Sequence, residues 1–139
     1  MSDAKPPVAL ELIWERDLVF AGKSGAVEMR LDSDAVMGPS PMQALAFSLA
    51  GCMAMDVVHV LKKGRHDLRG LRADLLGTRA VDNPKRFTSF ELKYTVTGDV
   101  QDDAVQRAID LSRDKYCSVW HSLRQDIEFT ITHEVVTGV

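Results

Sequence analysis

The stretch formed by residues 44–55 carries no charged side chain, and it constrains the fold more than any other feature of the sequence. It follows Ser40-Pro41-Met42-Gln43, in which serine suits a helix cap, proline suits the first helical position, and glutamine stands three residues after the cap. We expect a helix from here to about Lys63, ended by Gly64. Because a helix that is apolar on every face is buried on every side, this one must be the central core element, covered by sheets or by a second subunit.

Strand-like segments on both sides of this helix indicate an α+β fold in a single domain, residues 1–139. The clearest is the alternating segment 87–97, which is typical of a half-buried antiparallel strand. Asp102 and Asp103 suit the start of a second helix, which we expect to break near Cys117 and to continue as a short helix to Arg124. The predicted strands are residues 8–14, 18–21, 26–32, 68–80, 87–97 and 127–136, with a turn at residues 22–25.

Charge and composition exclude several classes of protein. With 17 basic and 20 acidic side chains the chain has a net charge of −3, which makes it a poor candidate for binding nucleic acid. The longest uncharged run, residues 35–55, is interrupted by glycine and proline and does not predict a membrane span. The N-terminus lacks the features of a secretory signal. We therefore expect a cytoplasmic protein without a membrane or nucleic-acid partner.

The two cysteines are the first candidates for chemistry. Cys52 stands in small, apolar surroundings that are typical of a packing residue, and it would need a cation from another segment to become reactive. Cys117 has basic neighbours and stands where the next helix is expected to begin, which favours a thiolate. Since 65 residues separate the two, spacing alone leaves a redox pair and two unrelated thiols equally open.

Asp56 and His59 follow Cys52 by four and seven residues, so all three lie on roughly one side of the predicted helix. An ordinary pair near the helix end explains Asp56 and His59 without catalysis. Seven helical residues span about 10 Å, so His59 cannot deprotonate Cys52 directly. No metal-binding motif is visible among the cysteines and histidines, and we expect no metal site.

Four segments resemble the OsmC/Ohr family of organic hydroperoxide resistance proteins, and within it the YhfA-like branch. The resemblance extends over nearly the whole chain, and the two cysteines inside these segments make it specific. The segments are Gly38-Pro39-Ser40-Pro41-Met42-Gln43 leading to Leu49-Ala50-Gly51-Cys52; residues 60–65; residues 84–87 leading to 92–98; and Lys115-Tyr116-Cys117-Ser118-Val119.

The resemblance implies an OsmC-like fold, in which long central helices lie back to back in an intertwined homodimer wrapped by antiparallel sheets. It also implies a thiol peroxidase that acts on organic hydroperoxides. Cys52 would attack the peroxide and become a sulfenic acid, and Cys117 would condense with it to a disulfide. An external dithiol, lipoyl-type or other, would reduce that disulfide, so no bound cofactor and no metal is expected.

One departure from the family pattern concerns activation of the thiol. Well-studied members begin this helix with Pro-Glu-Glu, and the first glutamate pairs with an arginine beside the peroxidatic cysteine. Here the triplet is Pro41-Met42-Gln43, and the candidate arginines are Arg16 and Arg30. Gln43 could replace the glutamate in part, or act only in the helix cap.

Two other functions therefore stay open at this point. The first is a small-molecule binding or redox-sensing protein of the same fold, with weak or no peroxidase activity. The second is a cysteine-dependent transferase or hydrolase that uses Cys52 and His59, against which the helix geometry argues within one chain.

Overall fold

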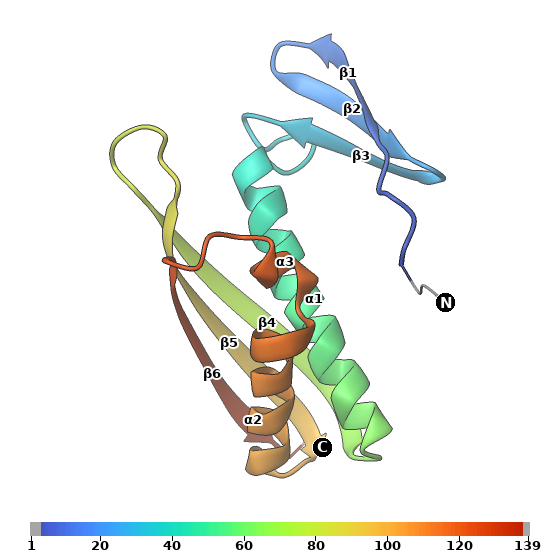
Figure 1. The fold of residues 1–139 in the computed structure, drawn as a ribbon, viewed down its shortest axis with the longest axis vertical. Coiled ribbons are helices and arrows are strands. Elements are labelled where there is room, and N and C mark those ends of the chain that lie inside the picture. Colours follow the sequence, from blue (N-terminus) through green and yellow to red (C-terminus); the bar gives the residue numbers. More distant parts are fainter. Residues whose placement is uncertain (1–3, 138–139) are drawn as a thin grey trace. The chain divides into compact units, whose positions relative to one another are not determined.

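The computed structural model describes residues 4–137, which form two compact units divided between Leu45 and Ala46 (Figure 1). Helix α1 (Pro41–Lys63) begins in the first unit and continues in the second. Each unit also contains a three-stranded sheet, which confirms the predicted α+β class.

The first unit contains β1 (Glu11–Arg16), β2 (Val19–Ser24) and β3 (Val27–Asp32), paired antiparallel with β2 in the centre. The three strands were predicted, but the expected turn at residues 22–25 is too long. Gly22 belongs to β2, where an added Cβ would come within 3.0 Å of the Met29 carbonyl oxygen. Within residues 22–25, Gly25 alone takes the left-handed conformation, with φ of 59°, and the turn consists of residues 25 and 26.

Asp32 organises the loop between β3 and α1. Its buried carboxylate accepts hydrogen bonds from the backbone N–H groups of three later residues, Asp34, Val36 and Met37, at 2.9–3.2 Å. At the end of this loop, the Ser40 hydroxyl accepts from the Gln43 N–H at 3.1 Å, and the Gln43 side-chain oxygen accepts from the Ser40 N–H at 3.0 Å. This reciprocal capping box is the helix start that the sequence predicts.

The second unit is built on β4 (Asp67–Arg79), β5 (Phe87–Asp99) and β6 (Glu128–Val136). β5 is the central strand; it pairs antiparallel with β4 and parallel with β6. The expectation of purely antiparallel sheets is therefore wrong for this one. A parallel neighbour requires a long crossover, and the helices between β5 and β6 supply it.

The crossover consists of α2 (Asp102–Leu111), a π-helical turn η1 (Ser112–Tyr116) and α3 (Ser118–His121). α2 begins where the acidic residues predict, but α3 ends at His121 rather than Arg124. Figure 1 shows the helices on one face of the sheet, and the buried side chains of β5 alternate with more exposed ones. The buried β5 side chains include Phe90, Leu92, Tyr94 and Val96.

Within the second unit, α1 is buried along one stripe only, so the all-round burial predicted from its composition is not reached in a single chain. Phe47 and Met55 are 71% and 73% exposed. The helix is long and apolar enough to cross a membrane by length and composition, which for one helix is weak evidence of a membrane span, and it carries one buried stripe. That stripe consists of Leu49, Met53, Val57 and Leu61.

Candidate functional site: two cysteines and an aspartate

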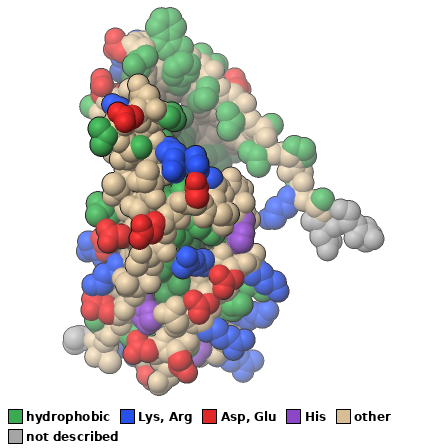
Figure 2. Space-filling model, turned by 60° about the vertical axis from the view of Figure 1, so that its left-hand side comes forward, with side chains coloured by type: hydrophobic (Ala, Val, Ile, Leu, Met, Phe, Trp, Pro, Cys, Tyr) green, Lys and Arg blue, Asp and Glu red, His purple; other side chains and the backbone are tan. Residues whose placement is uncertain are grey.

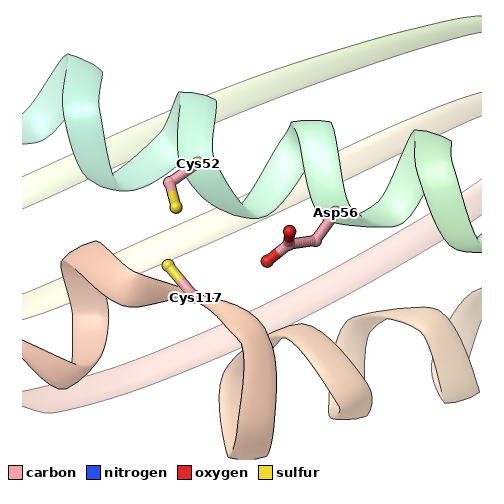
Figure 3. A group of neighbouring side chains, drawn as sticks. All are labelled: Cys52, Asp56 and Cys117. Atoms are coloured by element: carbon pink, nitrogen blue, oxygen red, sulfur yellow. The ribbon is translucent and has the colours of Figure 1, made fainter. Parts of the chain in front are cut away.

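The structure brings Cys52 and Cys117 together. Their Sγ atoms and a carboxylate oxygen of Asp56 all lie within 4.8 Å of one another. Figure 3 shows the two sulfur atoms pointing toward each other from α1 and from the segment before α3, with the carboxylate one helical turn further along α1. Both thiols are free, Cys117 fully buried and Cys52 partly exposed. The fold thus supplies the proximity that the spacing left open.

Cys117 lies at the joint between η1 and α3. Its backbone N–H donates to the Ser112 carbonyl at 2.7 Å, and its Sγ accepts from the Trp120 N–H at 3.4 Å. The π-helical turn ends here, and the backbone of Cys117 is extended before α3 begins. π-helical turns are frequent at functional sites because they displace the residues that follow.

A hydrogen bond between Ser112 and Asp56 ties this joint to α1. The Ser112 hydroxyl donates to Asp56 Oδ2 at 2.8 Å, and the serine is fully buried. Because Asp56 is one turn after Cys52 and Ser112 is five residues before Cys117, this contact helps to fix the separation of the sulfur atoms.

Burial makes Cys117 a weak acid. It raises the pKa of the Cys117 thiol from an ordinary value of 9.0 to about 11, and the neighbouring Cys52 and Asp56 add to the effect. The Trp120 N–H opposes it by donating to the sulfur. At neutral pH Cys117 is therefore a protonated thiol, held beside the more accessible Cys52.

Tyr94 is the remaining titratable group of this region. Its side chain is fully buried, and its hydroxyl has no hydrogen-bond partner among residues 4–137. Burial raises the pKa of the Tyr94 phenol, and the charges of Cys117, Asp56 and Cys52 raise it further. The phenol consequently stays protonated next to the cysteine pair.

The other predicted site residues do not belong to this cluster of Cys52, Asp56 and Cys117. His59 is exposed, and the Gln43 side chain is engaged in the helix cap. Arg30 pairs with Glu15, with Nε 2.6 Å from Oε1, and Arg16 is exposed on β1. Of the seven predicted residues, only Cys52, Cys117 and Asp56 form the cluster described above.

A cavity of about 840 Å³ opens beside the cluster and is lined by α1, α2 and Tyr116 at the end of η1. Asp56 belongs to both the cavity wall and the cysteine cluster. Most of the other charged groups on the wall are cationic or titratable to cations: His59, Lys63, His66 and Arg107.

Two thiols and a carboxylate could also coordinate a thiophilic metal ion, since zinc is commonly bound by such atoms. Structural zinc sites use four ligands, whereas this group offers three within the part of the chain that is described. The expectation that no metal is bound stays a prediction.

Sequence analysis did not identify Ser112 or Tyr94 as site residues. Ser112 begins the π-helical turn η1, and the turn that directs its hydroxyl to Asp56 has no recognisable sequence pattern. Tyr94 lies within the alternating segment 87–97, which predicts a half-buried strand. A signal was present there, because a buried tyrosine normally needs a partner for its hydroxyl.

An α+β fold with two free cysteines side by side defines a class of dithiol proteins, and the comparisons with known proteins identify the family. The family model described as OsmC-like protein matches residues 31–132, and the chain belongs to this family. The protein YhfA of Escherichia coli K12 is 39% identical over 128 residues, which cover 90% of this chain and 96% of YhfA. The predicted family and its YhfA-like branch are thus confirmed.

Solved structures agree with this assignment. A hypothetical protein from Aquifex aeolicus superimposes with a TM-score of 0.89 at 30% identity, covering 97% of this chain and all of the other. An organic hydroperoxide resistance protein from Legionella pneumophila has a TM-score of 0.71 at 13% identity, covering 96% of this chain and all of the other. At that identity the second match shows the fold alone.

Proposed function

We propose that the protein is a thiol-dependent peroxidase that reduces organic hydroperoxides through Cys52 and Cys117. The observation that carries the proposal is the meeting of two free thiols, 65 residues apart in the sequence, with Sγ atoms within 4.8 Å. Some solved relatives of the same fold are named organic hydroperoxide resistance proteins, which supports the proposal.

The difference in burial between Cys52 and Cys117 indicates which thiol attacks the peroxide and which completes the disulfide. Cys52 is the more accessible thiol and would meet the peroxide, whereas Cys117 is enclosed and remains protonated until needed. The Cys52 thiolate attacks the terminal peroxide oxygen, the O–O bond breaks, and the alkoxide takes a proton and leaves as an alcohol. Cys52 is now a sulfenic acid, oxidised by two electrons.

Condensation then forms the disulfide. The Cys117 sulfur attacks the Cys52 sulfur, the S–O bond breaks, and the oxygen leaves as water with the Cys117 proton. To form the disulfide, the sulfur atoms must close from within 4.8 Å to about 2.05 Å. An external dithiol, lipoyl-type or other, would reduce the disulfide, so the cycle needs no metal or flavin.

The same proposal includes a cytoplasmic homodimer. The exposed Phe47 and Met55 on α1 are apolar side chains that a second copy would cover, as the family resemblance implies. Apolar side chains are also exposed over much of the first unit (Figure 2), among them Leu12, Trp14 and Val27. Arg16 or Arg30 would supply the cation that activates Cys52, and Gln43 is committed to the cap.

Turnover of cumene hydroperoxide with a dithiol reductant tests the function. We expect Cys52→Ser to abolish turnover, and Cys117→Ser to permit one oxidation without recycling. Arg16→Ala and Arg30→Ala, assayed in parallel, identify the activating arginine as the variant that slows the first oxidation. Undiminished turnover by Cys52→Ser would refute the proposal.

The cavity favours a second candidate, a small-molecule binding or redox-sensing protein with weak or no peroxidase activity. Its volume of about 840 Å³ is within the range of ligand pockets, and Met42 stands where well-studied relatives have a glutamate. Saturable ligand binding without peroxide turnover would favour this candidate.

A further inference from the structure

Tyr94 is a buried polar group for which the reaction above has no role. It lies on the inner face of β5, its side chain is 0% exposed, and its hydroxyl is unpartnered within residues 4–137. Phenylalanine would fill the same space without the cost of burying a lone hydroxyl. A tyrosine here is therefore explained best by a partner that is present in another state of the protein.

The surroundings of the hydroxyl indicate which partner is missing. Tyr94 lies on the buried face of β5, and α1 and the crossover helices lie together on one face of this sheet (Figure 1). The titratable groups that raise the pKa of the phenol are Cys117, Asp56 and Cys52, the three members of the cysteine cluster. Ser112 already donates to Asp56, and Trp120 already donates to Cys117. A protonated phenol beside these groups can still donate one hydrogen bond, and it suits an acceptor that arrives with the substrate.

We infer that the Tyr94 hydroxyl donates a hydrogen bond to the oxygen atom that a hydroperoxide transfers to Cys52. The inference rests on the proposed peroxidase function and adds a residue to it. When the Cys117 sulfur attacks Cys52, the S–O bond breaks and negative charge develops on the departing oxygen. A fixed donor that is itself buried stabilises that charge until the oxygen takes the Cys117 proton and leaves as water.

The chain offers a matched pair of variants, since Tyr94 and Tyr116 are its two tyrosines. Tyr94→Phe removes the buried hydroxyl, and Tyr116→Phe removes one from a ring that is 49% exposed. Each variant is oxidised by two routes, with cumene hydroperoxide and with oxidised glutathione. The second route forms the same disulfide by thiol–disulfide exchange, releases two glutathione molecules, and transfers no oxygen.

We expect Tyr94→Phe to slow disulfide formation by the peroxide route at least about tenfold; losing one well-placed oxyanion donor costs enzymes roughly 100- to 1000-fold. The exchange route should stay within about twofold of the wild type, because it involves no oxygen to stabilise. Tyr116→Phe should match the wild type by both routes. Reduced Tyr94→Phe should resist urea at least as well as the wild type, since its hydroxyl has no partner in that state.

Each contrary result has a separate meaning. Equal peroxide rates for Tyr94→Phe and wild type would overturn the inference and leave the peroxidase intact. Equal slowing by both routes would assign Tyr94 to packing and would also overturn it. A wild-type protein that reacts with oxidised glutathione but not with peroxide would overturn the proposed function and this inference together.

A spectroscopic measurement keeps the test valid even if Tyr94→Phe fails to fold. In the double variant Cys117→Ser/Tyr116→Phe, peroxide leaves a sulfenic acid on Cys52, and Tyr94 is the remaining tyrosine. Hydrogen-bond donation should move the near-ultraviolet tyrosine band to longer wavelength on oxidation. An unchanged tyrosine band after confirmed sulfenic acid formation would overturn the inference.

Discussion

The hydrogen bond from Ser112 to Asp56 joins the two segments that carry the cysteines, and Ser112→Ala removes it with little change of volume. Hydrogen bonds to charged groups contribute about 1.5–3 kcal/mol, and Asp56 is partly exposed, so water would replace some of the loss. We therefore expect the free energy of unfolding of the reduced protein to fall by about 1.5 kcal/mol. Asp56→Ala should be similarly costly, because it leaves the buried Ser112 hydroxyl without its acceptor.

A double-mutant cycle separates this hydrogen bond from other effects of the substitutions. Once one partner is gone, losing the second costs less. The two single losses of stability should therefore add up to about 1 kcal/mol more than the loss in the double variant, and this difference is the coupling energy. Urea denaturation followed by circular dichroism, at one protein concentration, measures all four proteins. Ser122→Ala is the control, because its hydroxyl makes an exposed bond within the end of α3 and should change stability by less than about 0.5 kcal/mol.

The rate of disulfide formation should also depend on the hydrogen bond between Ser112 and Asp56. Without it, η1 is less firmly held against α1, and Ser112→Ala should form the Cys52–Cys117 disulfide more slowly than Ser122→Ala after peroxide is added. A coupling energy below about 0.3 kcal/mol, together with unchanged disulfide formation, would refute the reasoning that this bond positions the cysteines.

Three further predictions concern the helix cap and two titrations. Gln43→Ala should lower the free energy of unfolding by about 1 kcal/mol, as measured in urea, by opening the reciprocal bond with Ser40; an unchanged midpoint would contradict the capping role. Burial raises the pKa of Cys117 from 9.0 to about 11, so the unfolded chain loses the proton first as pH rises, and stability should fall from about pH 9 by at most about 1.4 kcal/mol per pH unit. Cys117→Ser should remove the fall between pH 9 and 10, whereas the fall above about pH 10 should persist because burial also raises the pKa of Tyr94; an unchanged profile between pH 9 and 10 in this variant would contradict the assignment. The backbone N–H groups of the loop after β3 hold the pKa of Asp32 below its ordinary value, so its stabilising effect is present at neutral pH and is lost as pH falls from about 4 through the lowered pKa; Asp32→Asn should remove this part of the acid dependence from thermal melts, and a wild-type-like profile would contradict it.

Much of the fold could be predicted because local chemistry determines it. Ser40 and Gln43 form the cap that their spacing predicts, and alternation along residues 87–97 identifies the central strand. The parallel pairing of β6 could not be read in this way, since an alternating strand looks alike in either direction. The composition of the long helix predicts that its apolar faces are buried. It does not show whether the same chain or a second one buries them.

The candidate site depends on contacts between segments that are far apart in the sequence. Such contacts leave no local sequence pattern, so this part of the site could not be predicted. Cys52 and Cys117 meet because α1 and the crossover lie on one face of the same sheet. The resemblance to a family suggested the pair, whereas spacing alone did not. The sequence did not identify Ser112 or Tyr94 as site residues. Their positions depend on a π-helical turn and on a strand register, and neither leaves a local sequence pattern.

The central claim, that Cys52 and Cys117 form one redox pair, is tested most directly by mass spectrometry of the intact protein after one equivalent of cumene hydroperoxide. The account predicts a loss of two hydrogens and no free thiol in the wild type, with no such disulfide in Cys52→Ser or Cys117→Ser. Two free, unmodified thiols in the treated wild type would contradict it.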